Sequence, residues 1–243
     1  MMKKIICSYL LALHLCAFSS AQNAKEDFSK INATLMGAGN LLMETEYRVY
    51  ENHLSKIPKE VSYGVIKQKD NKLYQHISTV QALMNDKYTV HLDSSERILV
   101  ISDPVKLGEQ RKLAMQVDLN TLLSQCKSIA FKEISKIDGV YLLAYKDDAV
   151  TEFDNCEIYF DRKAFVVKKM VLYYSDKMQL DDDKPEEKGQ EPKLEIIFKK
   201  IDTQAVFKDG EFDEKRFVET KGNKLTAASR YKGFRVIDNR YNR

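Results

Sequence analysis

The spacing of apolar residues changes along the chain from a helical period to the period of strands. Ala24, Phe28, Ile31 and Leu35 recur at intervals of three and four residues, which predicts an amphipathic helix that ends at Gly37. After this helix, apolar and polar residues alternate, and a period of two predicts strands. In the first half of the chain the pattern predicts a meander of strands at 41–49, 61–65, 73–83, 88–92 and 98–101.

A second helix is predicted from Asp118 to about Ile134. Asp118 is a favourable N-cap, and the apolar residues after it have helical spacing. These residues are Leu119, Leu122, Leu123, Cys126 and Ala130. Further strands are predicted at 139–145, 155–160, 165–174 and 194–198. Residues 181–191 contain no large apolar side chain, which is typical of a solvated loop.

These elements predict an α+β fold that is mainly β. We expect a strongly curved antiparallel sheet, or half-barrel, with the two helices covering its concave face. The expected division is a signal peptide at 1–21, a half-barrel domain at 22–200 and a C-terminal extension at 201–243 packed on the sheet. Scattered aromatic side chains would attach this extension: Phe207, Phe212, Phe217, Tyr231, Phe234 and Tyr241.

The beginning of the chain has the composition of a secretory signal. Two lysines precede an apolar run over residues 5–18, and small residues end at Ala21. A lipoprotein signal acylated at Cys16 is the alternative, but Leu15 occupies a position where a small residue is expected. We therefore predict export to the periplasm with cleavage near Ala21. No later segment is long and apolar enough to predict a transmembrane span.

The charge balance argues against binding to nucleic acid. The chain has 39 basic and 36 acidic residues, a formal net charge of +3. Proteins that bind nucleic acid normally concentrate a larger basic excess on one face. A hydrophobic content of 44% suffices for a globular core.

The chain lacks the residue patterns of metal sites and of common catalytic sets. After signal removal the histidines are His53, His76 and His91, and none lies within four residues of another. The acidic residues at 181–187 lack the alternate spacing and the turning glycine of a calcium loop. There is no GxSxG motif and no phosphate-binding glycine loop. We therefore expect no metal, no cofactor and no enzymatic activity.

Two cysteines remain in the mature chain, Cys126 and Cys156. Export would bring them into a compartment where disulfides persist, so they form a candidate disulfide. Both also lie on predicted apolar faces, where free thiols pack as small hydrophobes. The sequence leaves these two alternatives open.

The alternation within the strands selects a candidate apolar surface on the concave face of the sheet. Its expected ligand-binding residues are Tyr63, Val65, Tyr88, Val90, Leu92, Met170, Leu172, Tyr174, Ile196 and Phe198. If the helices fill the concavity, these residues form an ordinary core. If the helices cover it loosely, the residues line a pocket for an apolar ligand.

Two segments carry a resemblance to a known family. The segment YGVIKQKDNKLYQHI at 63–77 and the segment YTVHLDSSERILVISDP at 88–104 resemble the LolA-like family of periplasmic carriers. Gly64 and Asp93 stand at positions where that family has a strand glycine and a turn aspartate. The resemblance implies an incomplete barrel, covered by helices, that holds a lipid or lipoprotein acyl chain. The alternative function is a non-enzymatic interaction protein that docks onto a cell-envelope protein complex.

Overall fold

The computed structural model describes residues 24–35, 37–104, 123–149, 151–177, 189–221 and 224–240. The predicted signal peptide at 1–21, residues 181–188 of the predicted acidic loop and Tyr241 lie outside these residues. Residues 24–35 form a helix. The described helix reaches residue 35, and Gly37, where the sequence predicts its end, lies in a turn.

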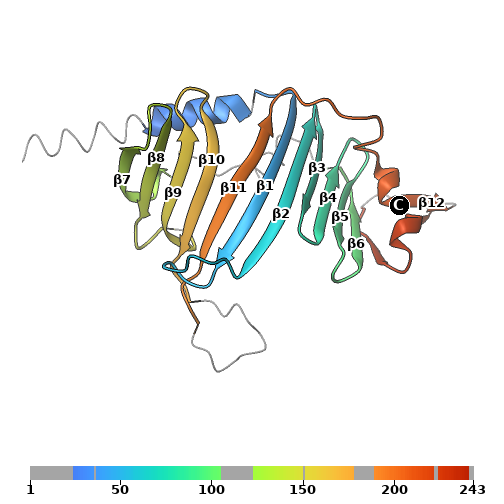
Figure 1. The fold of residues 1–243 in the computed structure, drawn as a ribbon. Helices are drawn as coiled ribbons and strands as arrows, with labels where there is room; N and C mark the ends of the chain where they lie inside the picture. The colour runs from blue at the N-terminus through green and yellow to red at the C-terminus, as the bar shows by residue number, and fades with distance from the viewer. Residues whose placement is uncertain are drawn as a thin grey trace, which may run out of the picture. The chain divides into compact units, whose positions relative to one another are not determined.

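Strands make up most of the described chain (Figure 1). The first six are β1 (Asn40–Tyr50), β2 (Glu60–Lys69), β3 (Lys72–Ile77), β4 (Val80–Met84), β5 (Thr89–Asp93) and β6 (Ile98–Ser102). The next five are β7 (Cys126–Glu133), β8 (Asp138–Tyr145), β9 (Phe153–Asp161), β10 (Val166–Tyr174) and β11 (Lys193–Asp202). The C-terminal segment contains η1 (Glu214–Arg216), β12 (Val218–Lys221), β13 (Lys224–Ala227), η2 (Ser229–Tyr231) and β14 (Arg235–Asp238).

The hydrogen-bonded strand order among the described residues is β14-β6-β5-β4-β3-β2-β1-β11-β10-β9-β8-β7. Neighbouring strands from β2 to β6, and from β11 through β10, β9 and β8 to β7, pair antiparallel, whereas β14 pairs with β6 in parallel. Strands β12 and β13 form a separate hairpin. The prediction of a mainly-β fold built on a large antiparallel sheet is therefore confirmed.

The second predicted helix is wrong over most of its length. Cys126–Glu133 form β7, and only residues 123 and 124 of the predicted segment are helical among those described. Ile129 and Phe131 point into the core beside β8, whereas Ala130 and Lys132 are exposed. This alternation has a period of two, and pairing with β8 prevailed over the helical spacing of the upstream leucines. Helix 24–35 is thus the one predicted helix found in the described chain.

The third predicted strand, at 73–83, is a hairpin of two strands. β3 and β4 pair antiparallel with Ile77 opposite Val80, so Ser78 and Thr79 form the turn. Ser78 has a φ of 53°, in the left-handed region where glycine or asparagine is usual. Because neither residue occupies this turn, the sequence contains no strong turn signal there.

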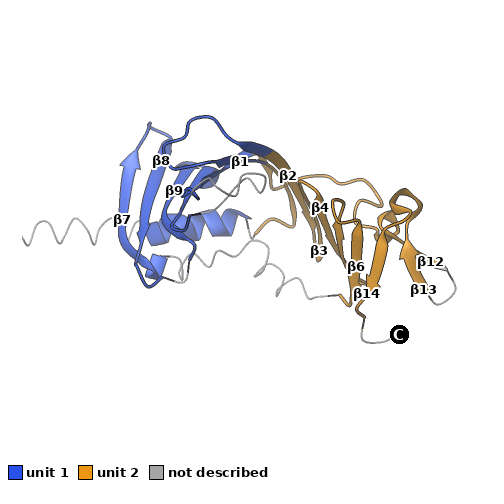
Figure 2. Cartoon of the chain, turned by 90° about the horizontal axis from the view of Figure 1, so that it is seen from below, with its two compact units in different colours: residues 1–36, 46–61, 117–198 blue, residues 37–45, 62–116, 199–243 orange. Residues whose placement is uncertain are grey.

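The chain forms two compact units (Figure 2). Unit 1 comprises residues from 1–36, 46–61 and 117–198, and unit 2 comprises residues from 37–45, 62–116 and 199–243. The predicted boundary between 22–200 and 201–243 stays a prediction. Each unit has its own hydrophobic core.

The core of unit 1 lies between helix 24–35 and one face of β8–β10. In Figure 2 the strands of this unit curve around the helix. The buried residues are Ala24, Phe28, Ile31, Tyr141, Leu143, Tyr145, Cys156, Ile158, Phe160 and Val167. The apolar stripe predicted for the helix is therefore the surface that the helix buries.

The core of unit 2 lies between β3–β6 and the C-terminal segment. Its largest members are Tyr74, Leu83, Val90, Leu92, Leu99, Ile101, Phe212, Phe217, Leu225 and Tyr231. Phe217 is fully buried, and its ring stacks on Tyr231 with centroids 5.9 Å apart. Phe212 and Phe207 meet edge to face at 5.3 Å. The scattered aromatic residues after Phe198 therefore supply one side of this core.

Candidate functional site

The apolar face of unit 1 that packs against helix 24–35 is the candidate site, and we call it the helix-covered face. Tyr141 on β8 lies at its centre. The Tyr141 ring is 5.0 Å from that of Phe28 on the helix and stacks on Phe160 of β9 at 5.5 Å. Aromatic pairs at these distances add to the stabilisation that comes from buried area. The helix is thus fixed over β8 and β9.

A polar contact also fixes the helix. The hydroxyl group of Tyr141 donates a hydrogen bond of 2.7 Å to Asp27 Oδ2. Burial, followed by this hydrogen bond, raises the pKa of Tyr141 above its ordinary value. The phenol therefore stays neutral and remains the donor over the physiological pH range.

The helix-covered face becomes more open toward β10 and β11. One row of cross-strand neighbours runs from Ile158 on β9 through Met170 on β10 to Ile196 on β11. Ile158 is 2% exposed, whereas Met170 and Ile196 are only partly buried. The face is closed beneath the helix and less closed on β10 and β11.

The next row repeats the same gradient. Cys156 on β9 pairs with Leu172 on β10, which pairs with Leu194 on β11. Cys156 is buried, and the two leucines are partly buried. Phe198 also packs partly buried against this core. The partly buried residues of these rows are aliphatic or thioether side chains, with no charged group among them.

The alternate residues of the same strands form a second face, which we call the polar face, where hydrogen-bonded tyrosines and carboxylates lie beside the buried Val140 and Val171. Tyr159 and Tyr173 donate hydrogen bonds of 2.6 and 2.9 Å to the two carboxylate oxygens of Glu157. Tyr50 donates one of 2.7 Å to Glu195. Burial, followed by the bond to Glu157, raises the pKa of Tyr159 to about 12. Unit 1 therefore has one apolar and one hydrogen-bonded face on the same strands.

The structure divides the ten predicted ligand-binding residues between the two units. Met170, Leu172 and Phe198 pack on the helix-covered face, and Ile196 pairs with Met170. Tyr174 meets Phe153 at the edge of the same core, with ring centroids 4.7 Å apart.

The other five residues lie in unit 2. Val90 and Leu92 are 0% and 1% exposed in the core beneath the C-terminal segment, and Val65 and Tyr88 pack against that core. Tyr63 is 67% exposed. Val90 and Leu92 are thus part of a closed core, and a ligand-binding role for the ten residues stays a prediction. Alternation shows which residues share a face of a strand, but not which segment will cover that face.

No disulfide joins Cys126 to Cys156. Cys126 lies opposite Tyr145 and Cys156 opposite Leu143, so β8 separates the two cysteines. Both contribute to the core of unit 1, as the alternative of packed thiols predicts. Burial raises the pKa of Cys126 to about 11 and that of Cys156 to about 12, so neither thiol is activated.

Sequence reasoning missed two residues of the helix-covered face, Ile129 and Phe131. Both lie on β7, which was predicted as a helix. The Phe131 ring is 5.1 Å from that of Tyr141 and lies over Gly139. The alternation of Ile129 and Phe131 with Ser128, Ala130 and Lys132 was the signal that could have identified them.

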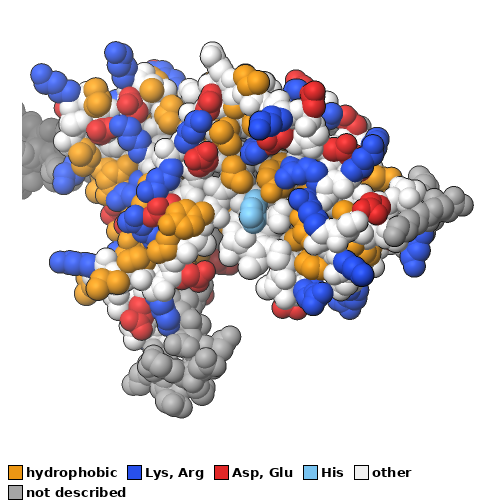
Figure 3. Space-filling view, turned by 45° about the vertical axis from the view of Figure 1, so that its right-hand side comes forward, with side chains coloured by type: hydrophobic (Ala, Val, Ile, Leu, Met, Phe, Trp, Pro, Cys, Tyr) orange, Lys and Arg blue, Asp and Glu red, His pale blue; other side chains and the backbone are white. Residues whose placement is uncertain are grey.

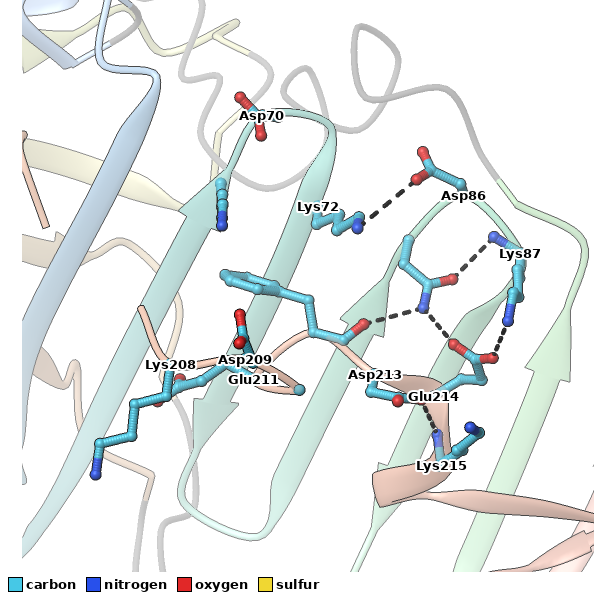
Figure 4. Close-up of a pocket in the computed structure, with 14 residues that line it drawn as sticks. Asp70, Lys72, Asp86, Lys87, Lys208, Asp209, Glu211, Asp213, Glu214 and Lys215 are labelled. Atoms are coloured by element: carbon cyan, nitrogen blue, oxygen red, sulfur yellow. Dashed lines mark hydrogen bonds and ion pairs between the residues drawn. The ribbon is translucent and has the colours of Figure 1, made fainter. Parts of the chain in front are cut away.

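A hollow of about 360 Å³ in unit 2 lies between two turns and the C-terminal segment (Figure 4). Asn85 donates hydrogen bonds to the Phe212 carbonyl at 3.1 Å and to Glu214 Oε2 at 3.0 Å. Lys87 pairs with Glu214 at 2.7 Å, and Lys72 lies 3.9 Å from Asp86. The contacts of Asn85 and Lys87 attach the C-terminal segment to the turn before β5, whereas Lys72 and Asp86 pair between two turns of the sheet.

A second hollow in unit 2, of about 330 Å³, is lined by Tyr63, Gly64, His76 and Glu44 among others. Figure 3 shows a histidine side chain on the surface of the molecule. His76 Nε2 lies 2.9 Å from the Ser78 carbonyl oxygen. Within the described chain, no three His, Cys, Asp or Glu side chains are grouped so that they could hold a metal ion. None of the described helices has the length and apolar character needed to cross a bilayer.

Comparison with known proteins finds only distant structural similarity among the solved structures reported below. No protein-family model and no curated protein matches the chain. An uncharacterized conserved protein from Thermus thermophilus is 10% identical, with a TM-score of 0.45 over 89% of this chain and 99% of that one. The Mycobacterium tuberculosis lipoprotein LppX is 8% identical, with a TM-score of 0.42 over 77% and 99%.

A LolA superfamily protein from Nitrosomonas europaea is also similar. It is 11% identical, with a TM-score of 0.29 over 75% of this chain and 94% of that one. A member of the family that the sequence resembles is therefore among the structural neighbours. With TM-scores below 0.5, these likenesses carry no conclusion about the function of this chain.

Proposed function

We propose that this chain is a periplasmic carrier or binding protein that holds an apolar ligand, a lipid or lipoprotein acyl chain, on the helix-covered face. One observation carries this proposal. The rows that contain Met170, Leu172, Ile196 and Phe198 stay only partly buried, although they continue a face that is closed beneath the helix. An acyl chain laid along β10 and β11 would complete the burial of these side chains.

Burial alone would hold such a ligand. Each methylene group moved out of water contributes about 0.8 kcal/mol, so an acyl chain binds without a charged recognition group. Residues on the helix, such as Leu35, pack partly buried against the same core. Movement of the helix would uncover the ligand for release. No step of this mechanism requires a catalytic residue or a cofactor.

Two adjacent isoleucines on β11 provide a matched test. Ile196 pairs with Met170 on the helix-covered face, and Ile197 pairs with Lys169 on the polar face. Both are partly buried in the structure. Ile196→Glu would place a carboxylate where the ligand lies, and desolvating this charge is costly. Ile197→Glu adds the same group beside a lysine on the polar face.

Titration with a fluorescent fatty acid measures the difference. The wild type and Ile197→Glu are expected to bind with similar affinity, and Ile196→Glu at least about tenfold more weakly. Circular dichroism and thermal unfolding check that each variant is folded. Ile196→Ala is a milder second variant that tests the site if the glutamate prevents folding. Equal affinity of both glutamate variants, or a wild type that binds no fatty acid, would contradict the proposal.

One observation favours a second function, the interaction protein that docks onto an envelope complex. Val90 and Leu92 lie in a core that the C-terminal segment closes, so unit 2 buries its apolar residues without a ligand. A protein whose cores are all closed would act through its surface. Native mass spectrometry of the protein purified from its own periplasm separates the two functions. A retained lipid supports the carrier, and an associated protein without lipid supports the docking protein.

A further inference from the structure

The loop between β1 and β2, residues 51–59, places two aliphatic side chains in water. We call it the tip loop, and Figure 1 shows it joining the lower ends of β1 and β2. Leu54 is 89% exposed and Ile57 is 83% exposed. One exposed aliphatic residue is common on a protein surface, but two in a loop of nine residues form a feature that requires an explanation.

Hydrogen bonds within the tip loop determine its conformation. The Asn52 side chain accepts a bond of 3.0 Å from the Leu54 N–H, and the Asn52 carbonyl accepts one of 3.1 Å from the Ser55 N–H. The Ser55 hydroxyl group in turn accepts a bond of 3.3 Å from the Asn52 N–H. Pro58 restricts the backbone of Ile57 to extended conformations. The two side chains therefore extend from an ordered turn.

Neighbouring strands of unit 1 hold the loop in place. Lys193 on β11 donates hydrogen bonds to the carbonyl oxygens of His53 and Ser55, at 3.3 and 3.1 Å. The His53 ring meets that of Tyr173 edge to face at 5.1 Å, and His53 Nε2 lies 3.1 Å from the Tyr174 carbonyl oxygen. These contacts fix the base of the loop and leave its two aliphatic side chains outside the core. Because the loop is already ordered, less conformational entropy is lost when Leu54 and Ile57 bind to a partner.

The chemistry of the tip fits a lipid surface better than a protein partner. Leu54 and Ile57 are almost completely exposed. A protein partner would therefore need a pocket of its own that surrounds both side chains. A bilayer adapts to a projecting group and needs no such match. Lys56, which is exposed, precedes Ile57 and can reach lipid phosphate groups, while Glu51 lies at the start of the loop and Glu60 is the first residue of β2.

We propose that the tip loop docks the protein on a phospholipid membrane by inserting Leu54 and Ile57 into the boundary between headgroups and acyl chains. This interaction is independent of the ligand held on the helix-covered face. It would bring unit 1 to the surface from which a lipid is taken or to which it is delivered.

The chain contains no tryptophan, so a single introduced indole reports on its own surroundings. Leu54→Trp is compared with Val206→Trp, since Val206 is 94% exposed and lies in unit 2. On addition of vesicles of phosphatidylethanolamine and phosphatidylglycerol, the emission of Trp at position 54 is expected to shift to shorter wavelength. Brominated lipid is expected to quench it. The indole at position 206 should show neither change, and equal behaviour of both positions would overturn the proposal.

Vesicle flotation of the full chain tests the native side chains. The double change Leu54→Ser with Ile57→Ser is expected to lower the bound fraction at least about tenfold, whereas Val206→Ser leaves it unchanged. Fatty-acid binding measured without vesicles should be the same for all three proteins, which separates this test from that of the carrier function. A wild type that does not float with vesicles, or a double variant that floats equally well, would refute membrane docking by the loop.

Discussion

Tyr141 and Asp27 are joined by a hydrogen bond of 2.7 Å, although 114 positions separate them in the sequence. The bond connects the centre of β8 with the helix that opens the described chain. It is a polar contact beside a core of aromatic rings, and it ties the helix to the sheet. The helix-covered face depends on this placement.

Removal of the Tyr141 hydroxyl group should weaken the attachment of the helix. Tyr141→Phe keeps the ring contacts with Phe28 and Phe160 and is expected to lower the free energy of unfolding by about 1 kcal/mol. Denaturant unfolding of this variant, of Asp27→Ala and of the double variant measures the coupling between the two groups. If the two single effects simply add, the hydrogen bond does not stabilise the protein.

Gly139 allows the Phe131 ring to lie on β8. A Cβ atom at position 139 would be 2.6 Å from Phe131 Cε2, closer than such atoms approach in proteins. Gly139→Ala must therefore displace the ring, and we expect a loss of about 1–3 kcal/mol. Gly39→Ala is the control, because a Cβ atom at that position has no neighbour within 4 Å. A larger loss in the control than in Gly139→Ala would be inconsistent with this role of Gly139.

The two thiols should react slowly in the folded protein. Burial raises the pKa of Cys126 to about 11 and that of Cys156 to about 12, so at pH 8 almost no thiolate is present. We expect slow modification by dithionitrobenzoate at this pH, fast modification in guanidinium, and Cys126 to react before the more buried Cys156. Mass spectrometry after partial labelling identifies the order. Rapid labelling of folded Cys156 would show that the core of unit 1 is not closed around it.

The C-terminal segment should be essential for the stability of unit 2. Phe217 is fully buried between Tyr231 and Tyr74, with centroids 5.9 and 6.4 Å away. Phe217→Ala is expected to cost about 3–5 kcal/mol, as truncation of a buried aromatic side chain does. Val206→Ala, at a residue that is 94% exposed, should change stability by less than about 0.5 kcal/mol. Chemical denaturation followed by circular dichroism compares the two, and similar midpoints would mean that the segment is not part of the core.

Local patterns predicted most of the secondary structure. Helix 24–35 was predicted from the spacing of its apolar residues. The structure buries these residues, among them Phe28 and Ile31. Strands β1 and β2 were predicted because apolar and polar residues alternate along them, and strands such as β8 (DGVYLLAY) and β10 (VVKKMVLYY) because they are rich in apolar residues. In both cases the pattern is present in the residues of the element itself.

The two wrong elements have different causes. Over 118–134, a helical spacing upstream and an alternating pattern downstream overlap at Cys126, and pairing of the downstream part with β8 produced a strand. At Ser78 the turn has a left-handed backbone without glycine or asparagine, so the sequence did not indicate it.

The sequence by itself determined which residues of each strand share a face, and hence that Val90 goes with Leu92 and Met170 with Leu172. Only the tertiary structure decided what covers each face: the C-terminal segment over the first pair, and the helix near the second. The same holds for the tip loop, since Leu54 and Ile57 resemble core residues in the sequence and are exposed in the fold. The physical reason is that alternation follows from the backbone of a single strand, whereas the burial of a side chain depends on segments distant in the sequence.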